Sequence, residues 1–172
     1  MQRLKYILVW LSRIFHCRGF GIQSPTYYWL VRYVINEHWP YYQYAAFMNE
    51  DDWLTRKLGQ LYFRLANWRQ PTVIESDAYW NYFQAGCKKA TFGESSELIR
   101  MMLDGDYRKQ LAFIYNKVKD DTVLIVEGLW RNRSFWKEVK ADERAVVTFD
   151  LYYCGIVLFD KKQQKQNYII NF

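Results

Sequence analysis

The sequence predicts an α/β domain with helices in its first part and a sheet in its second. Three observations indicate this fold class: helical spacing of apolar residues over 4–68, alternation of short strand-like runs with helical patterns from residue 72, and three closely spaced apolar runs at the end. Helices followed by strand–helix alternation are typical of a sheet covered by helices. We expect one domain spanning 1–172, with a helical part over 1–70 and a sheet core over 71–172.

The composition indicates a packed protein, because 51% of the 172 residues are hydrophobic and 20% are aromatic. The net charge of +6 is moderate and the basic residues are mostly scattered, which argues against nucleic acid as a partner. Cys17, Cys87 and Cys154 are widely spaced, so we expect reduced thiols in a cytoplasmic protein, with neither disulfide nor zinc site. The apolar run over 6–11 is too short for a membrane span and is followed by Arg13.

The first expected element is an amphipathic helix over residues 4–15. Its apolar side is formed by Leu4, Ile7, Leu8, Leu11, Ile14 and Phe15. We expect this side to pack on the rest of the domain. The first 36 residues contain five Arg or Lys and no acidic residue, so a helix lying on a membrane surface is the alternative.

Two more helices are expected before the first strand. The second covers about 25–37, with Ser24 as N-cap and a proline in its first turn. The third covers 52–68, after an N-cap at Asp51 or Asp52, and carries leucines along one side.

The second part of the chain alternates strands and helices. The expected elements are a strand over 72–74, a weak strand over 89–92, a helix capped by Ser95 or Ser96 that contains 98–103, a helix over 106–118, a strand over 122–126 and a helix over 134–140. The continuously apolar run 122–126 is typical of a parallel strand with both faces covered. Three closing strands over 145–149, 155–159 and 168–172 are interpreted as antiparallel.

Acidic residues follow several expected strands, at the side of the sheet where α/β folds bind ligands. They are Glu75, Glu94 and Glu127. Three carboxylates could hold a divalent cation, but the interpretation we favour is solvated strand ends without a metal. His16 and His38 have no partner at ligand spacing, and no pairing of a nucleophile with a base is recognisable.

Several segments resemble a known family and occur in that family's order. They are the Gly-bearing loop 18–25 ending in Ser-Pro, the helix 58–71, the strand and acidic exit 123–130, and the closing segments 148–159 and 167–172. These segments are similar to class I S-adenosylmethionine-dependent methyltransferases, and within them to a bacterial O-methyltransferase-like group common in Bacteroidetes. The resemblance covers most of the chain from about residue 16, and implies a Rossmann-like sheet.

The cofactor loop departs from the family pattern. The family's motif is an acidic residue with glycines at the second and sixth positions after it, whereas here Glu75 is followed by Asp77 and Asn81. Side chains at these positions would crowd the cofactor, and the loop loses the positive-φ freedom of glycine. By the resemblance, Glu94 and Glu127 correspond to acidic positions after the fourth and fifth strands. We interpret Glu75, Asp77, Glu94 and Glu127 as a vestigial cofactor site.

The resemblance also implies a truncated sheet. Only about a dozen residues separate the strand 72–74 from the strand 89–92, where the family places two strands and two helices. With 89–92 matched to the family's fourth strand, the second and third strands are missing and the C-terminal edge is antiparallel. The strand 72–74 would then be an exposed edge that needs a cover. We expect the loop 78–84, the N-terminal helices or a second copy of the chain, forming a homodimer, to cover it.

Two functions follow from these observations. The first is a non-catalytic methyltransferase-like protein without cofactor, acting as a binding module or protein partner. The alternative is an active S-adenosylmethionine-dependent O-methyltransferase with an atypical loop and an acceptor held by the N-terminal helices. We favour the first, because both glycines and the ribose-binding strand are lost together. The aromatic residues Tyr79, Trp80, Tyr82 and Phe83 are expected to fill the space left by the cofactor and the lost strands.

Overall fold

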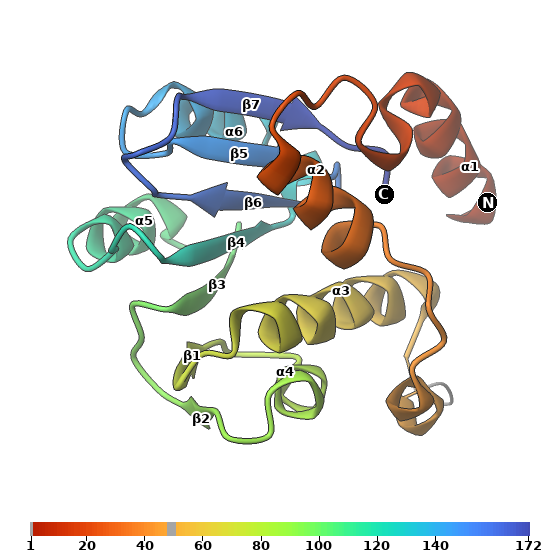
Figure 1. Ribbon diagram of the computed structural model, residues 1–172, viewed down its shortest axis with the longest axis horizontal. Helices are drawn as coiled ribbons and strands as arrows, with labels where there is room; N and C mark the ends of the chain where they lie inside the picture. Colours follow the sequence, from red (N-terminus) through yellow and green to blue (C-terminus); the bar gives the residue numbers. More distant parts are fainter. Residues whose placement is uncertain (1, 48–50) are drawn as a thin grey trace.

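The computed structural model describes residues 2–47 and 51–172 as a seven-stranded mixed sheet with helices on both faces (Figure 1). The strand order is β2-β1-β3-β4-β6-β5-β7. The strands are β1 (Val73–Glu75), β2 (Thr91–Phe92), β3 (Leu98–Met102), β4 (Val123–Glu127), β5 (Val147–Asp150), β6 (Cys154–Leu158) and β7 (Gln166–Ile169). All the pairings are parallel except the two made by β6. The expected α/β class is confirmed.

Six α-helices and four short helical turns accompany the sheet in the described part of the chain. The α-helices are α1 (Gln2–Ser12), α2 (Pro25–Leu30), α3 (Trp53–Arg69), α4 (Trp80–Gly86), α5 (Tyr107–Tyr115) and α6 (Arg133–Ala141). The turns are η1 (Ile14–Gly19), the π-type turn η2 (Val31–Ile35), η3 (Tyr42–Phe47) and η4 (Leu129–Arg131). Ser24 accepts from the backbone N–H of Tyr27, and Asp52 from that of Thr55, so both residues act as N-caps.

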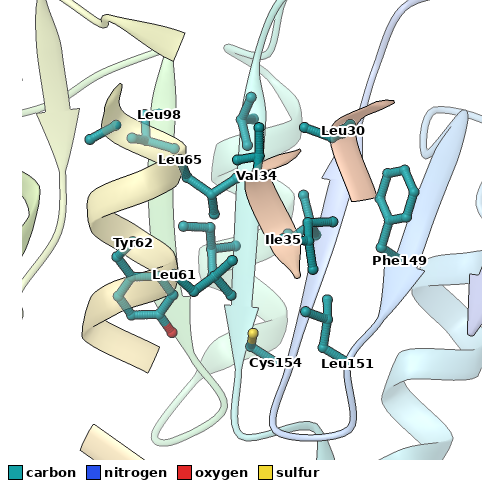
Figure 2. Close-up of a cluster of buried hydrophobic side chains, with 14 of the residues drawn as sticks. Leu30, Val34, Ile35, Leu61, Tyr62, Leu65, Leu98, Phe149, Leu151 and Cys154 are labelled. Carbon is teal, nitrogen blue, oxygen red and sulfur yellow. The ribbon is translucent and has the colours of Figure 1, made fainter. Parts of the chain in front are cut away.

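Two hydrophobic cores lie on the two faces of the sheet, because apolar side chains alternate along its central strands. Helices α2 and α3 with η2 cover one face, where the residues labelled in Figure 2 meet: Leu30, Val34, Ile35, Leu61, Tyr62, Leu65, Leu98, Phe149, Leu151 and Cys154. Helices α5 and α6 cover the other face (Figure 1), where Ile114 and Trp136 pack on Leu124 and Val126. This arrangement explains the continuously apolar sequence of β4.

The segment 98–103, expected as a helix, is a strand over most of its length. Leu98 packs in the core next to α3, while Ile99 and Met101 pack in the core next to α5. β3 pairs with β1 on one side and with β4 on the other. A short run of apolar residues fits a helix or a strand by its spacing, and here pairing between two parallel strands determines the outcome.

The strand β1 is not an edge of the sheet, contrary to expectation. Val73 and Ile74 pair with Thr91 and Phe92 of β2 on its outer side, and Ile74 and Glu75 pair with β3 on the other. The segment 89–92 therefore covers β1, and β3 takes the position next to β4 that was expected for 89–92. The expectation of a homodimer through an exposed β1 edge loses its basis.

The C-terminal edge of the sheet is also different from the expected one. β6 lies between β4 and β5 and is antiparallel to both, so the pairing expected for the segments 145–149 and 155–159 is correct. The last strand, β7, pairs with β5 in parallel, so the edge itself is not antiparallel. Both sides of β6 are occupied, and β7 therefore adds to the free side of β5.

The helix α1 packs with the side opposite to the expected one. Its apolar residues Leu4, Ile7, Leu8 and Leu11 are half-exposed or more, and Phe15 beyond the helix is 81% exposed. The packed side instead contains Tyr6 and Val9, which contact the core next to α3, and is continued by the buried Arg13. The ring of Tyr6 is stacked on Trp53 with 4.2 Å between centroids. These contacts and the ion pair of Arg13 set the rotation of the helix.

Within the described ranges, 2–47 and 51–172, no helix is long and apolar enough to cross a membrane.

Candidate functional site

A buried ion-pair cluster lies at the carboxyl ends of β1, β3 and β4. Glu127 is the last residue of β4, and Arg100 is the third residue of β3; both side chains point toward the face covered by α3. Nε of Arg100 donates to Oε2 of Glu127 at 2.8 Å, and the two side chains are 5% and 7% exposed. Arg100 also forms an ion pair with Asp77, in the loop after β1. One guanidinium group therefore joins the ends of three strands.

Two tyrosines complete this cluster. The hydroxyl of Tyr62, on α3, donates to Oε2 of Glu127 at 2.6 Å, and the hydroxyl of Tyr79 donates to Oε1 at 3.4 Å. The guanidinium of Arg100 lies 5.0 Å from the centroid of the Tyr79 ring. Burial, and then the charge of Glu127, raise the pKa of both phenols, well above the usual value for Tyr62. Both therefore act as neutral donors to a buried carboxylate.

Aromatic side chains pack the space around this cluster. Phe83 is stacked on Tyr62 with 5.3 Å between ring centroids, and Tyr79 meets Tyr62 edge-on at 4.9 Å. Tyr82 is buried and its hydroxyl donates to Asp51 at 2.6 Å. Tyr79, Tyr82 and Phe83 therefore pack together in the region after β1. Trp80 differs, because it is half-exposed and stacks on Phe92 over β2.

The other two predicted site residues lie elsewhere. Nζ of Lys117, just after α5, is 2.5 Å from Oε2 of Glu75 and 3.6 Å from Oε1 of Glu94. Glu75 follows Ile74, which packs in the α3-side core, so its side chain points to the opposite face. The four predicted residues therefore divide into two pairs, each on its own cation: Asp77 and Glu127 on Arg100, and Glu75 and Glu94 on Lys117.

This division separates the three carboxylates that could have held a divalent cation, since Glu127 lies on the other face from Glu75 and Glu94. No group of three or more His, Cys, Asp or Glu side chains that could hold a metal ion occurs within the part of the chain that the structure describes.

A third charged group, not predicted from the sequence, lies at the end of β5. Asp150 is 1% exposed and accepts from Nη2 of Arg13 and Nη2 of Arg133, both at 2.6 Å. Burial by itself would raise the pKa of Asp150, but the hydrogen bonds from Arg133 and Arg13 outweigh it and the pKa is lowered. Sequence patterns could not show this group, because Arg13 and Asp150 are 137 residues apart.

A cavity of about 620 Å³ lies on the face of the sheet that α3 covers. It is formed between α1, the start of α3 and the turn between β5 and β6. Its lining consists of Tyr6, Ile7, Val9, Trp10, Trp53, Arg56, Lys57, Tyr153 and Phe172. The lining contains two cations and no Asp or Glu. The only advance signal in the sequence was the richness of the N-terminal part in aromatic residues.

A second cavity, of about 240 Å³, adjoins the first and shares Trp10, Lys57 and Phe172 with it. Its lining adds Arg18 and Arg64. His38 lines it too, and its pKa is lowered by burial and by the surrounding cations, with Lys57 first among them. The lining of this smaller cavity also contains one acid, Glu37, so cations outnumber acids around Lys57.

The fold and these side chains define a protein with an α/β sheet, a filled strand-end cluster and an adjacent aromatic cavity. Comparisons of the chain with family models, with curated proteins and with solved structures found no match. The function is therefore argued from the residues themselves.

Proposed function

We propose that this chain is a non-catalytic binding protein on a methyltransferase-like, Rossmann-like sheet, with a degenerate S-adenosylmethionine site. The observation that carries this proposal is the cluster of Asp77, Arg100 and Glu127 with Tyr62 and Tyr79. It occupies the carboxyl ends of β1, β3 and β4, which is the side where open α/β sheets take their ligands.

Energetics support this proposal. A cofactor placed between the ends of β1 and β4 would have to displace Tyr79 and separate Arg100 from at least one of its two carboxylates. Separating Arg100 from Glu127, whose side chain is buried, would cost about 3–5 kcal/mol, because the other charge is left uncompensated. The pair with Asp77 contributes less, because the Asp77 side chain is exposed to solvent. The positions of the two family glycines carry Asp77, which is paired with Arg100, and Asn81.

The alternative, an active methyltransferase with an atypical loop, is favoured by one observation. The cavity of about 620 Å³ next to α1 has the size of a small-molecule site and lies near the strand ends. In that case the segment between β1 and α4, which contains Tyr79, would have to move before the cofactor binds.

Calorimetric titration with S-adenosylmethionine and S-adenosylhomocysteine distinguishes the two functions. We expect no saturable binding of either compound up to millimolar concentration. Saturable binding in the micromolar range, weakened by Glu127→Gln, would contradict the degenerate site and favour the enzyme. The tryptophan fluorescence of the same sample checks that the protein is folded.

A further inference from the structure

We propose that the cavity between α1 and α3 binds an organic anion with an apolar body, such as an aliphatic or aromatic carboxylate, with Lys57 and Arg56 next to its charged group. This inference deepens the proposed binding function, on which it rests, by giving a chemical class to the ligand. It depends on the cavity's walls and on its charge.

The walls are apolar and largely aromatic. Tyr6 is stacked on Trp53 at 4.2 Å, and Tyr153 meets both rings edge-on, at 5.9 and 6.2 Å between centroids. Rings that support one another in this way form a rigid surface for an apolar ligand. The volume of about 620 Å³ falls in the range of small-molecule sites, about 300–1,000 Å³.

The charge in the cavity is positive and incompletely balanced. The ammonium of Lys57 lies 4.2 Å from the ring centroid of Phe172 and 5.3 Å from that of Trp53. Among the ion pairs of the described residues, none involves Lys57 or Arg56. Placing a cation among aromatic rings removes water from it, and an anionic ligand would compensate for that loss.

Two buried donors at the cavity have no hydrogen-bond partner among the described residues. They are Nε of Arg56 and the hydroxyl of Tyr153. Arg56 does donate from Nη2 to the carbonyl of Asp51 at 3.2 Å, so this bond holds the side chain in place. Both atoms belong to residues that line the same cavity, but they are covered by neighbouring protein atoms, so a ligand would contact other parts of these two side chains.

The adjoining smaller cavity indicates where the charged group lies. Lys57 lines both cavities, and the smaller one adds Arg18 and Arg64 with a single acid, Glu37. Glu37 already accepts from the hydroxyl of Tyr41 at 2.8 Å. We therefore place the anionic group next to Lys57 and the apolar body between Tyr6, Trp53 and Tyr153.

Binding should depend on pH through Lys57. The titratable and charged groups around it are Arg56 and Arg64 on α3, Tyr6 on α1, Arg18, Glu37 and His38 at the smaller cavity, and Tyr153 and Cys154 at the start of β6. Burial, followed by the charge of Arg64, lowers the pKa of Lys57 to about 8. The lysine is therefore mostly charged at neutral pH and loses its proton at mildly alkaline pH.

The test is calorimetric titration of the full chain with decanoate and with 2-naphthoate, and with decanol and decylamine as uncharged and cationic controls. We expect saturable binding of at least one carboxylate, and binding at least about tenfold weaker for decylamine. Comparing decanoate with 2-naphthoate shows whether the apolar part of the ligand is aliphatic or aromatic. The proposal would be overturned if neither carboxylate bound, or if decylamine bound as tightly as the carboxylates.

Variants locate the site. Lys57→Met should weaken carboxylate binding by about tenfold or more, as expected for loss of a charged partner, and Lys57→Arg should retain most of it. Lys5→Met is the matched control, because Lys5 is exposed on α1 near its apolar side; it should leave the affinity unchanged. A loss in Lys5→Met without a loss in Lys57→Met would place the ligand on the surface of α1 and refute the cavity.

A measurement on the unmodified protein gives an independent check. The affinity for the carboxylate should fall about tenfold from about pH 7 to about pH 9.5, as Lys57 loses its charge. A constant affinity would contradict the role of Lys57. Absence of carboxylate binding overturns this inference alone, whereas binding of S-adenosylmethionine overturns the proposed function, so the two failures are distinguishable.

Discussion

Nε of Arg100 lies 2.8 Å from Oε2 of Glu127, although Arg100 is level with Ile125 in the pairing of β3 with β4. The guanidinium therefore reaches along the sheet toward the carboxyl end of β4. Tyr62 donates to the same carboxylate oxygen from α3, so the ion pair also connects the sheet to the helix that covers it. This buried ion pair therefore connects β3, β4 and α3 within the core.

Replacing Arg100 should strongly destabilise the fold. We expect Arg100→Met to lower the free energy of unfolding by about 3–5 kcal/mol, because Glu127 remains buried without its cation. The double variant Arg100→Met, Glu127→Met should be more stable than Arg100→Met alone, since both charges are then removed. Urea unfolding measures these differences. Arg108→Met, which removes an exposed ion pair with Glu138, is the control and should cause no resolvable change; an equally small effect for Arg100→Met would refute the prediction.

The ion pairs of Asp150 should make stability fall in acid. The folded-state pKa of Asp150 is lowered, so the unfolded carboxyl group binds a proton first as the pH decreases. The contribution of Asp150 is therefore present above its unfolded pKa of about 3.9 and is lost as the pH falls through the folded value. Asp150→Asn should be less stable at pH 7 and lose less stability between about pH 5 and pH 2. Urea midpoints across this range provide the measurement, and parallel pH profiles would contradict it.

Lys57 should reduce stability at neutral pH. Because burial lowers its pKa to about 8, the unfolded state binds more protons between about pH 8 and pH 10.4, and stability rises with pH across that window. Lys57→Met removes the penalty and should raise the free energy of unfolding at pH 7 by about 1–3 kcal/mol. The gain should shrink at pH 10. Equal gains at both pH values would show that the charge of Lys57 is not responsible.

The contact between α3 and α4 requires glycine at position 86. A Cβ atom on Gly86 would lie 2.2 Å from the carbonyl oxygen of Phe63, so the two helices would have to separate. We expect Gly86→Ala to cost about 1–3 kcal/mol or more in a thermal or urea unfolding experiment. Gly93→Ala is the control, because the nearest atom to its Cβ would be 4.0 Å away on Val73. Similar losses in both variants would argue against the steric explanation.

The exposed side of α1 should contribute little to folding. Leu11 is 50% exposed and Leu61 is fully buried on α3. Leu11→Gln should change the free energy of unfolding by less than about 0.5 kcal/mol, whereas Leu61→Ala should cost about 2–5 kcal/mol. A large loss for Leu11→Gln would show that this side of the helix is packed after all.

Local signals predicted many elements well. Asp52 and Ser24 cap their helices as expected, because an N-cap depends only on residues three positions away. The strand expected over 122–126 is observed as Val123–Glu127, and the helix expected over 134–140 as Arg133–Ala141. The prediction of a helix over 98–103 was wrong. The spacing of the apolar residues fits both a helix and a strand, and only the pairing of Leu98–Met102 with neighbouring strands decides between them.

The sequence by itself determined the α/β class, the order of helices before sheet and the strong buried strand β4, because apolar periodicity and caps are local properties. It also indicated acidic residues after strands, yet it named Asp77 and Glu127 without Arg100, which joins them. The tertiary structure alone decided which side of α1 packs, which strand covers β1 and how Lys57 comes to lie between Trp53 and Phe172. These features depend on contacts between residues far apart in the chain. Such contacts decide which charged side chains are buried and whether a buried charge has an ionic partner.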